Sequence, residues 1–190
     1  MINNSQRIIQ PHGGYRKLRS FQTTQIIYDA TVVFCDRFIE KFSRTRDQMI
    51  QAARSGTQNI AEGSMASATS KKTELKLTSV ARASLEELLL DYEDFLRQRG
   101  LCLWPKDSPE AMAVRNFYRS DTSDLSDKSD PYSIRTADAE TAANTLICLI
   151  NQASFLLGRQ ILKLEQSFVN EGGFTERLYQ VRSQSRRHSK

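Results

Sequence analysis

The chain has 190 residues, of which 39% are apolar, and its formal net charge is +5. This length suits one domain with appendages, and the apolar content suits one core of moderate size. Three cysteines at wide spacing, with no Cys-x-x-Cys pair, argue against a disulfide framework or a zinc site. No stretch resembles a signal peptide or approaches the roughly 18–20 apolar residues of a membrane span, so we expect a soluble, cytoplasmic protein with no membrane partner.

The positive charge lies at the two ends of the chain. Residues 1–20 carry four basic residues and no acidic one, and residues 174–190 carry five basic residues and one acidic one. We expect residues 1–19, with Pro11 and two glycines, to form a flexible basic arm. Basic ends add sequence-independent affinity for nucleic-acid phosphates, although the same charge can also serve only to keep a protein soluble.

The first half of the chain has the apolar period of amphipathic helices. One helix is predicted at about residues 20–42. A second is predicted to begin at Thr45, where Gln48 completes a capping box, and to end near Gly63. Residues 64–69 are small and polar and predict a tight connection.

Two further long helices are predicted in the second half. The third spans about residues 70–99 and stops before Gly100, which suits the position after a helix C-cap. The fourth spans about residues 139–169 and ends before a Gly-Gly pair.

Residues 101–138 lie between these two helices and have a different composition. They contain three prolines and the run SDTSDLSDKSD at 120–130. We expect a low-complexity, flexible insert with a short helix near residues 110–118. Aspartates recur every third residue in the run, whereas a calcium loop needs ligands at alternate positions and a central glycine, so we expect no metal site.

These elements predict an all-α protein, and the leading interpretation is an antiparallel four-helix bundle. Residues 20–170 would form the bundle, with the flexible insert before its last helix. Residues 171–190 would form a short basic C-terminal suffix. The short connections make the first three helices antiparallel neighbours, whereas the long insert also permits a crossover to the fourth.

The second helix has an unusual face of small and polar residues. Glycine in a helix costs about 1 kcal/mol against alanine, so close packing of a neighbouring helix would be the compensation. A half-buried amide there could bond across helices and fix register or oligomeric state. Glu62 would either pair with Lys71 or Lys72 or line a subunit interface. We expect this face to be a helix seam or the interface of a homo-oligomer; its residues are Ala52, Ser55, Gly56, Asn59, Glu62 and Gly63.

Several segments resemble a known family. The runs QMIQAARSGTQNIAEGS (48–64) and VARASLEEL (80–88) look like the signature of four-helix-bundle proteins encoded in intervening sequences of bacterial 23S ribosomal RNA genes. The accessory variability protein of diversity-generating retroelements is similar to the same family. NQASFLLGRQ (151–160) and FVNEGGFTERLYQVR (168–182) resemble a subgroup whose bundle carries a C-terminal suffix.

The resemblance implies a four-helix bundle that is commonly a homopentameric barrel. For the retroelement accessory protein it implies binding of nucleic acid and of a reverse transcriptase. No activity is established for most of the family. The insert and the last residues of the chain lie outside the shared pattern.

No pattern in the chain indicates catalysis. Bundle enzymes with two metals use Glu-x-x-His pairs, and the only histidines, His12 and His188, lie in the predicted tails. The chain has no Gly-rich phosphate loop and no Cys–His pair within the fold. The acidic stretch 86–94 is most simply a solvated helix face, and residues 50–80 do not fit a helix-turn-helix. We therefore expect no catalytic residue, cofactor or metal.

The function we expect is that of a nucleic-acid-binding accessory protein with weak sequence specificity. RNA and DNA are both open, and a reverse transcriptase or another nucleic-acid enzyme is the expected protein partner. The alternative is a scaffold oligomer that binds only protein. The expected nucleic-acid-binding residues are Arg16, Lys17, Arg19, Arg44, Arg46, Arg54, Lys71, Lys72, Lys76, Arg82, Arg177, Arg182, Arg186 and Arg187.

Overall fold

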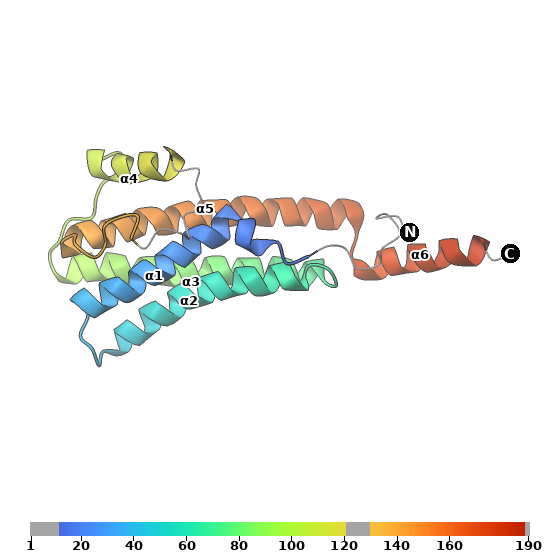
Figure 1. The fold of residues 1–190 in the computed structure, drawn as a ribbon, viewed down its shortest axis with the longest axis horizontal. Helices are drawn as coiled ribbons and strands as arrows, with labels where there is room; N and C mark the ends of the chain where they lie inside the picture. Colours follow the sequence, from blue (N-terminus) through green and yellow to red (C-terminus); the bar gives the residue numbers. More distant parts are fainter. Residues whose placement is uncertain (1–11, 121–129, 189–190) are drawn as a thin grey trace.

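The computed structural model describes residues 12–120 and 130–188, and this part of the chain is helical with no strand (Figure 1). The predicted all-α class and the four predicted long helices are confirmed. The elements in chain order are the short 3-10 helix η2 (Tyr15–Lys17), α1 (Arg19–Phe38), α2 (Arg44–Ala66), α3 (Lys71–Gln98), α4 (Pro109–Ser120), α5 (Ala139–Glu171) and α6 (Phe174–His188).

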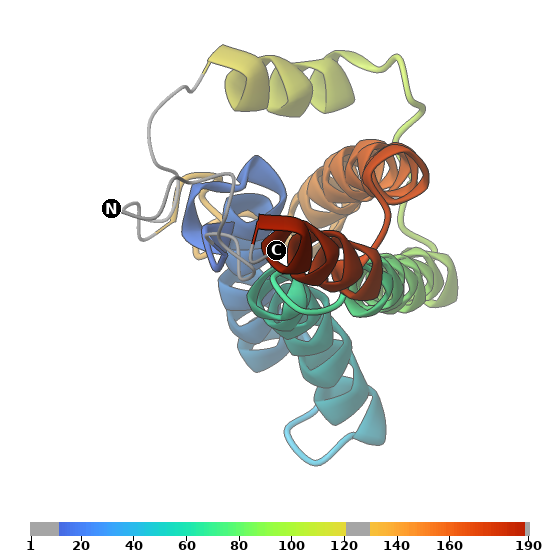
Figure 2. The same cartoon turned by 90° about the vertical axis from the view of Figure 1, so that its right-hand side faces the viewer.

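The helices α1, α2, α3 and α5 lie side by side as a helical bundle around one core (Figure 1 and Figure 2). The broadest contacts join α2 to α3 and α3 to α5. Phe34 of α1 packs edge-on against Tyr92 and Phe95 of α3, with ring centroids 4.9 Å and 4.8 Å away. The fully buried Tyr92 hydroxyl donates to Thr31 Oγ1 at 3.0 Å, so this polar group is satisfied inside the core.

The ends of the first two helices differ from the predictions. α1 ends at Phe38, four residues before the predicted end at Phe42. Phe38 still packs against the aromatic ring of Phe34 in the core, whereas Phe42 is 90% exposed, so a longer helix would not bury its side chain. The predicted capping box at Thr45 is wrong: Ser43 caps α2, and its hydroxyl accepts a hydrogen bond from the Thr45 backbone N–H at 3.2 Å.

The glycines near the other helix ends behave in two ways. α2 continues three residues past Gly63 to Ala66, because Gly63 lies in the helix interior and packs on α3. Gly100 has a φ of +64°, which confirms its predicted position after the C-cap of α3. The Leu101 N–H donates to the Leu96 carbonyl, so this carbonyl in the last turn of α3 has a hydrogen-bond partner.

The insert between α3 and α5 is more ordered at its two flanks than the sequence suggests. α4 confirms the predicted short helix, and its Tyr118 is buried and shares a hydrogen bond of 2.9 Å with Thr23 of α1. Ile134 is also buried, and its carbonyl accepts from Arg37. The expectation of a flexible insert is therefore corrected for residues 101–120 and 130–138, whereas residues 121–129 of the Ser/Asp run lie outside the described residues.

The predicted basic C-terminal suffix contains a further helix, α6, to which the sequence analysis assigned no secondary structure. Gly172, with a φ of +67°, ends α5, and α6 then continues beyond the end of the bundle (Figure 1). The described residues contain one stretch, Ala139–Gln184, covering α5 and the first part of α6, that is long and apolar enough by composition to span a membrane, whereas the sequence predicts no such span. Its buried residues, such as Leu146, Ile150 and Leu157, form part of the bundle core.

Candidate nucleic-acid interface

The two glycines of the predicted seam lie between α2 and α3 of the same chain. A Cβ atom on Gly56 would lie 2.9 Å from Leu85 Cδ2, and one on Gly63 would lie 3.3 Å from both the Glu74 carbonyl oxygen and Leu77 Cβ. Both glycines are buried. The small residues therefore let α3 approach α2 closely, which makes this face a helix seam within one chain.

The polar residues of the seam form a short network beside the glycines. Asn59 Nδ2 donates to the carbonyl and the hydroxyl oxygen of Ser55, at 2.9 Å and 3.0 Å. Ser55 Oγ lies 2.9 Å from Ser84 Oγ on α3, so the bond across the helices is made by the serines. The expectation that Asn59 itself bonds across helices is corrected, because its amide turns back onto its own helix.

Three residues of the seam, Ala52, Gly56 and Gly63, are buried within the chain and are therefore excluded from a subunit interface, whereas the place of Ser55, Asn59 and Glu62 in such an interface stays a prediction. Ala52 is only 4% exposed, because the helices of its own chain cover it, as they also cover Gly56 and Gly63. Glu62 is exposed, and it takes part in none of the ion pairs seen among the described residues. Of its two predicted partners, Lys71 and Lys72, Lys71 directs Nζ to Ser167 Oγ of α5 at 2.7 Å.

Some predicted nucleic-acid-binding cations hold the fold together. Arg19 donates to the Tyr118 carbonyl at 3.2 Å, and its guanidinium lies 4.9 Å from the centre of the Tyr118 ring. Arg46 forms an ion pair with Asp36 that joins α2 to α1, and this hydrogen bond raises the pKa of the Arg46 guanidinium. Arg46, held in this ion pair, has less freedom to follow a nucleic-acid backbone, whereas Arg19 also lines the groove described below.

Two further predicted cations lie against other parts of the chain. Arg82 is exposed, but its guanidinium extends over Gly158 of α5, where an added Cβ would lie 3.7 Å from Arg82 Nη1. Arg177 is half-buried, and its Nε atom is buried without a hydrogen-bond partner. The side chain of Arg187 lies outside the described residues.

The remaining predicted cations are exposed and fall into separate groups. Arg16 and Lys17 lie on η2, before α1, and Lys72 and Lys76 lie in the first two turns of α3. Arg44 and Arg54 lie on α2, away from the others. The exposed predicted cations are Arg16, Lys17, Arg44, Arg54, Lys72, Lys76, Arg82, Arg182 and Arg186.

A groove gathers basic side chains at the end of the bundle where α1 begins. It has a volume of about 960 Å³ and a partly apolar floor that includes Leu156 and Leu164. Arg19 from α1 and Arg159 and Lys163 from α5 line it. The groove thus brings together cations that are 140 or more residues apart in the sequence. We call it the basic groove.

Arg159 and Lys163 are absent from the residues that the sequence predicts. They lie four residues apart on α5, on the side opposite its buried stripe, and Arg159 and Lys163 are both exposed. A helical projection of residues 139–169 would have found them as a basic pair. Arg19 is among the predicted residues, but its position beside Arg159 and Lys163 depends on how α1 packs on α5.

One carboxylate also lines the basic groove. Glu74 of α3 is half-buried, and burial raises the pKa of its carboxyl group, an effect that the positive charge of Lys71 partly offsets. Burial weakens the solvation of this carboxylate, but the three cations around the groove outnumber it. The balance at this end of the bundle therefore favours an anionic ligand.

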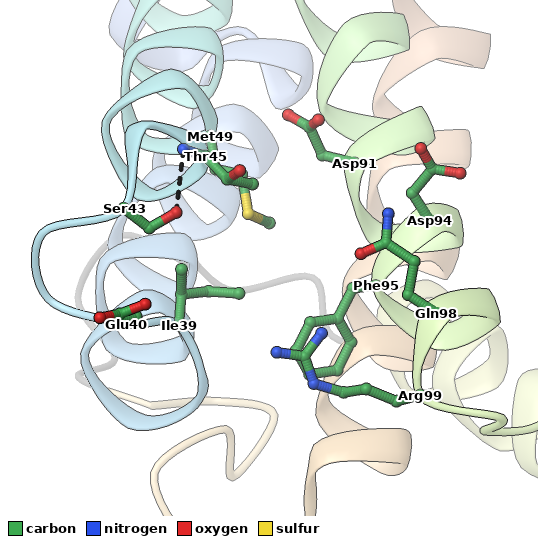
Figure 3. A pocket seen from close by; sticks show the side chains of 10 residues that line it. All are labelled: Ile39, Glu40, Ser43, Thr45, Met49, Asp91, Asp94, Phe95, Gln98 and Arg99. Atoms are coloured by element: carbon green, nitrogen blue, oxygen red, sulfur yellow. Dashed lines mark hydrogen bonds between the residues drawn. The ribbon is translucent and has the colours of Figure 1, made fainter.

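The opposite end of the bundle has a pocket with the opposite charge. It has a volume of about 300 Å³ and lies between the turn from α1 to α2 and the last turns of α3. Figure 3 shows Met49 and Thr45 on one wall facing Asp91 and Asp94 on the other. Burial, and then the charges of Glu87 and Asp94, raise the pKa of Asp91. Three carboxylates, of Glu40, Asp91 and Asp94, and one guanidinium, of Arg99, line this pocket, so it suits phosphate less well than the basic groove does.

The described residues contain no group of three or more His, Cys, Asp or Glu side chains that could hold a metal ion. Cys35 is buried in the core, which raises the pKa of its thiol to about 12, so it is poorly suited to act as a nucleophile. Comparison of the chain with protein-family models, with curated proteins and with solved structures found no match.

Proposed function

We propose that this protein is a non-enzymatic nucleic-acid-binding accessory protein that holds the phosphate backbone in the basic groove. The observation that carries the proposal is the convergence of Arg19, Arg159 and Lys163 on one groove at one end of the bundle. Arg16 and Lys17 are exposed and lie on η2, two or three residues before Arg19, so they add positive charge near the basic groove.

The proposed architecture is an antiparallel four-helix bundle with α4 and α6 as additions. The contacts between neighbouring helices support it. Gly56 meets Leu85 whereas Gly63 meets Glu74, so α2 and α3 run in opposite directions. Ser20 donates to Gln160 at 3.0 Å, which places the start of α1 beside the second half of α5.

The proposed mode of binding is electrostatic and weakly sequence-specific. Three to five cations contact phosphates and release counterions, so affinity falls steeply with salt. Base stacking plays little part, because Tyr15 near the groove packs edge-on against Phe21, with ring centroids 4.8 Å apart. RNA and DNA both fit this mode.

The proposed setting is a cytoplasmic homo-oligomer that assists a nucleic-acid enzyme such as a reverse transcriptase. This partner rests on the family resemblance of the NIAEGS segment (59–64) and of the suffix. The second candidate function is a scaffold that binds only protein. It is favoured by one observation: α6 forms none of the substantial helix interfaces among the described residues.

The test is fluorescence anisotropy of labelled single-stranded RNA and DNA with the wild-type protein and a variant that combines Arg159→Glu and Lys163→Glu. We expect affinity at low salt to fall about tenfold or more, and the slope of log K against log salt to fall by about one for each lost phosphate contact.

The matched control combines Arg44→Glu and Arg54→Glu, which makes the same charge change on α2 outside the basic groove. We expect a loss of about twofold or less, from the change in net charge alone. Equal losses in both variants would refute the groove as the binding surface. Absence of binding by the wild-type protein at low salt would leave the scaffold function.

A further inference from the structure

The helix α6 forms no broad interface with another helix among the described residues. The substantial interfaces of the described chain involve η2 and α1 to α5, and none involves α6. In Figure 1 and Figure 2 it extends past the end of the bundle. Isolated helices of about 12–15 residues are marginal in water, and α6 has 15, so its stability requires a contact that the bundle does not supply.

One face of α6 combines apolar and basic side chains. Leu178 and Tyr179 lie beside Arg182 and Arg186 along a shallow groove of about 300 Å³. Tyr179 is 74% exposed. The face therefore suits a partner helix that offers apolar side chains flanked by carboxylates.

The chain contains such a helix face on α3. Residues 83–96 carry five acidic residues and no basic one. Glu86 and Glu87 are exposed, and between them and Asp94 lies Leu90, which is 57% exposed. Ala83 and Leu90, seven residues apart, form an apolar row among these carboxylates. We call this surface the acidic face of α3.

The acidic face of α3 is crowded with like charges. Glu87 and Asp94 add to the effect of burial in raising the pKa of Asp91, which shows that the negative charges there oppose one another. Asp94 is paired with Arg97, at 2.7 Å, but neither Glu86 nor Glu87 forms an ion pair among the described residues. An arginine-bearing helix would relieve this repulsion.

The α6 helix of the same molecule is badly placed to do so. α3 begins beside the end of α5, where Lys71 bonds to Ser167, and Glu86 lies 15 residues further along, at about 22 Å. α6 starts at that same end and extends the other way (Figure 1). Its direction is fixed in part by the Gly173 N–H, which donates to Glu176 Oε2 at 2.9 Å.

We propose that α6 of one copy docks on the acidic face of α3 of a second copy. The proposal deepens the homo-oligomer of the proposed function, since it names the surfaces that assemble it. Arg182 and Arg186 then bind protein and not nucleic acid. Because the two surfaces differ, the contact is head-to-tail, and repetition gives a closed ring or an open chain.

The test uses two charge-reversed variants, measured by light scattering on a size-exclusion column at low salt. One combines Arg182→Glu with Arg186→Glu, and the other combines Glu86→Arg with Glu87→Arg. All four side chains are exposed, and circular dichroism verifies that each variant keeps its helix content. We expect the wild-type chain to form an oligomer and each variant alone to elute as a monomer.

Mixing the two variants provides the decisive arm. In the mixture each negative α6 meets a positive α3, and each positive α6 meets a negative α3, so we expect the oligomer to return. A chain that carries all four substitutions should also assemble by itself. A monomeric wild type, variants that keep the oligomer, or a mixture that stays monomeric would overturn the proposal.

The same samples separate this proposal from the proposed function. Anisotropy with labelled RNA and DNA is measured on the wild-type chain, because the positive charge that Glu86→Arg and Glu87→Arg add would itself raise affinity for nucleic acid. Nucleic-acid binding without the predicted changes in mass would refute the docking and keep the function. The predicted changes in mass without nucleic-acid binding would keep the docking and refute the function.

Discussion

The α2–α3 seam and α6 form a contrast between a helix face that has its partner and a helix that lacks one. The seam is covered within the chain, with Gly56 and Gly63 against α3. α6 has the polar composition of an ordinary tail, and it forms no substantial interface with the other described helices. Small residues thus indicate that a helix packs closely, but they do not indicate whether its neighbour belongs to the same chain.

The largest expected effect comes from filling the seam. Gly56→Leu should lower the free energy of unfolding by about 3 kcal/mol, because the new side chain overlaps the buried Leu85. Urea denaturation followed by circular dichroism measures the change. Gln58→Leu, at an exposed position of the same helix, is the control and should change stability by less than about 0.5 kcal/mol. A stable Gly56→Leu chain that only changes oligomeric state would restore the subunit-interface interpretation.

A smaller loss of stability is expected when a buried core tyrosine loses its hydroxyl group, and none when an exposed tyrosine of α6 does. Tyr92→Phe removes the hydrogen bond to Thr31 and leaves a buried acceptor less satisfied, so it should cost about 1 kcal/mol. Tyr179→Phe, on the exposed face of α6, should leave the unfolding midpoint of the monomer unchanged. Equal losses for both substitutions would mean that α6 is packed as tightly as the core.

Neutralising one carboxylate of α3 should raise stability slightly. The pKa of Asp91 is raised above its ordinary value of 3.8, so the folded protein binds this proton more tightly than the unfolded chain does. Stability therefore falls as pH rises from 3.8 through the raised value. Asp91→Asn should raise the melting temperature at pH 7, and the gain should vanish at pH values below 3.8. A gain that persists in acid would require another cause.

The smallest effect is expected from removal of α6. A chain that ends at Gly172 should keep the free energy of unfolding of the bundle within about 0.5 kcal/mol, because α6 contributes no substantial interface to it. Thermal and urea unfolding at low protein concentration provide the measurement. A loss of several times this size would show that α6 stabilises its own bundle.

The sequence predicts the long helices well, because each has an apolar stripe, and α3 and α5 also have clear stop signals in Gly100 and Gly172. It is less accurate where the answer depends on tertiary packing. Phe42 has the right period to extend α1, but no neighbour covers it, so the helix ends earlier. Tyr118 and Ile134 lie in a polar segment whose composition hides two buried anchors.

The candidate site is predicted only in part, for a similar reason. Charge alone selects Arg46 and Lys71, but the structure uses both in contacts with neighbouring helices. Arg159 and Lys163 were overlooked because they lie in the most apolar helix. Their meeting with Arg19 depends on the packing of α1 beside α5, which no local pattern encodes.

Hydrogen exchange across a range of protein concentrations tests the contrast between the seam and α6 most directly. Amides of α2 and α3 around Gly56 and Gly63 should be strongly protected at every concentration, because their partner is in the same chain. Amides of residues 174–188 should be unprotected when dilute and become protected as copies associate. Protection of α6 that is independent of concentration, or seam amides that exchange freely in the monomer, would contradict the account.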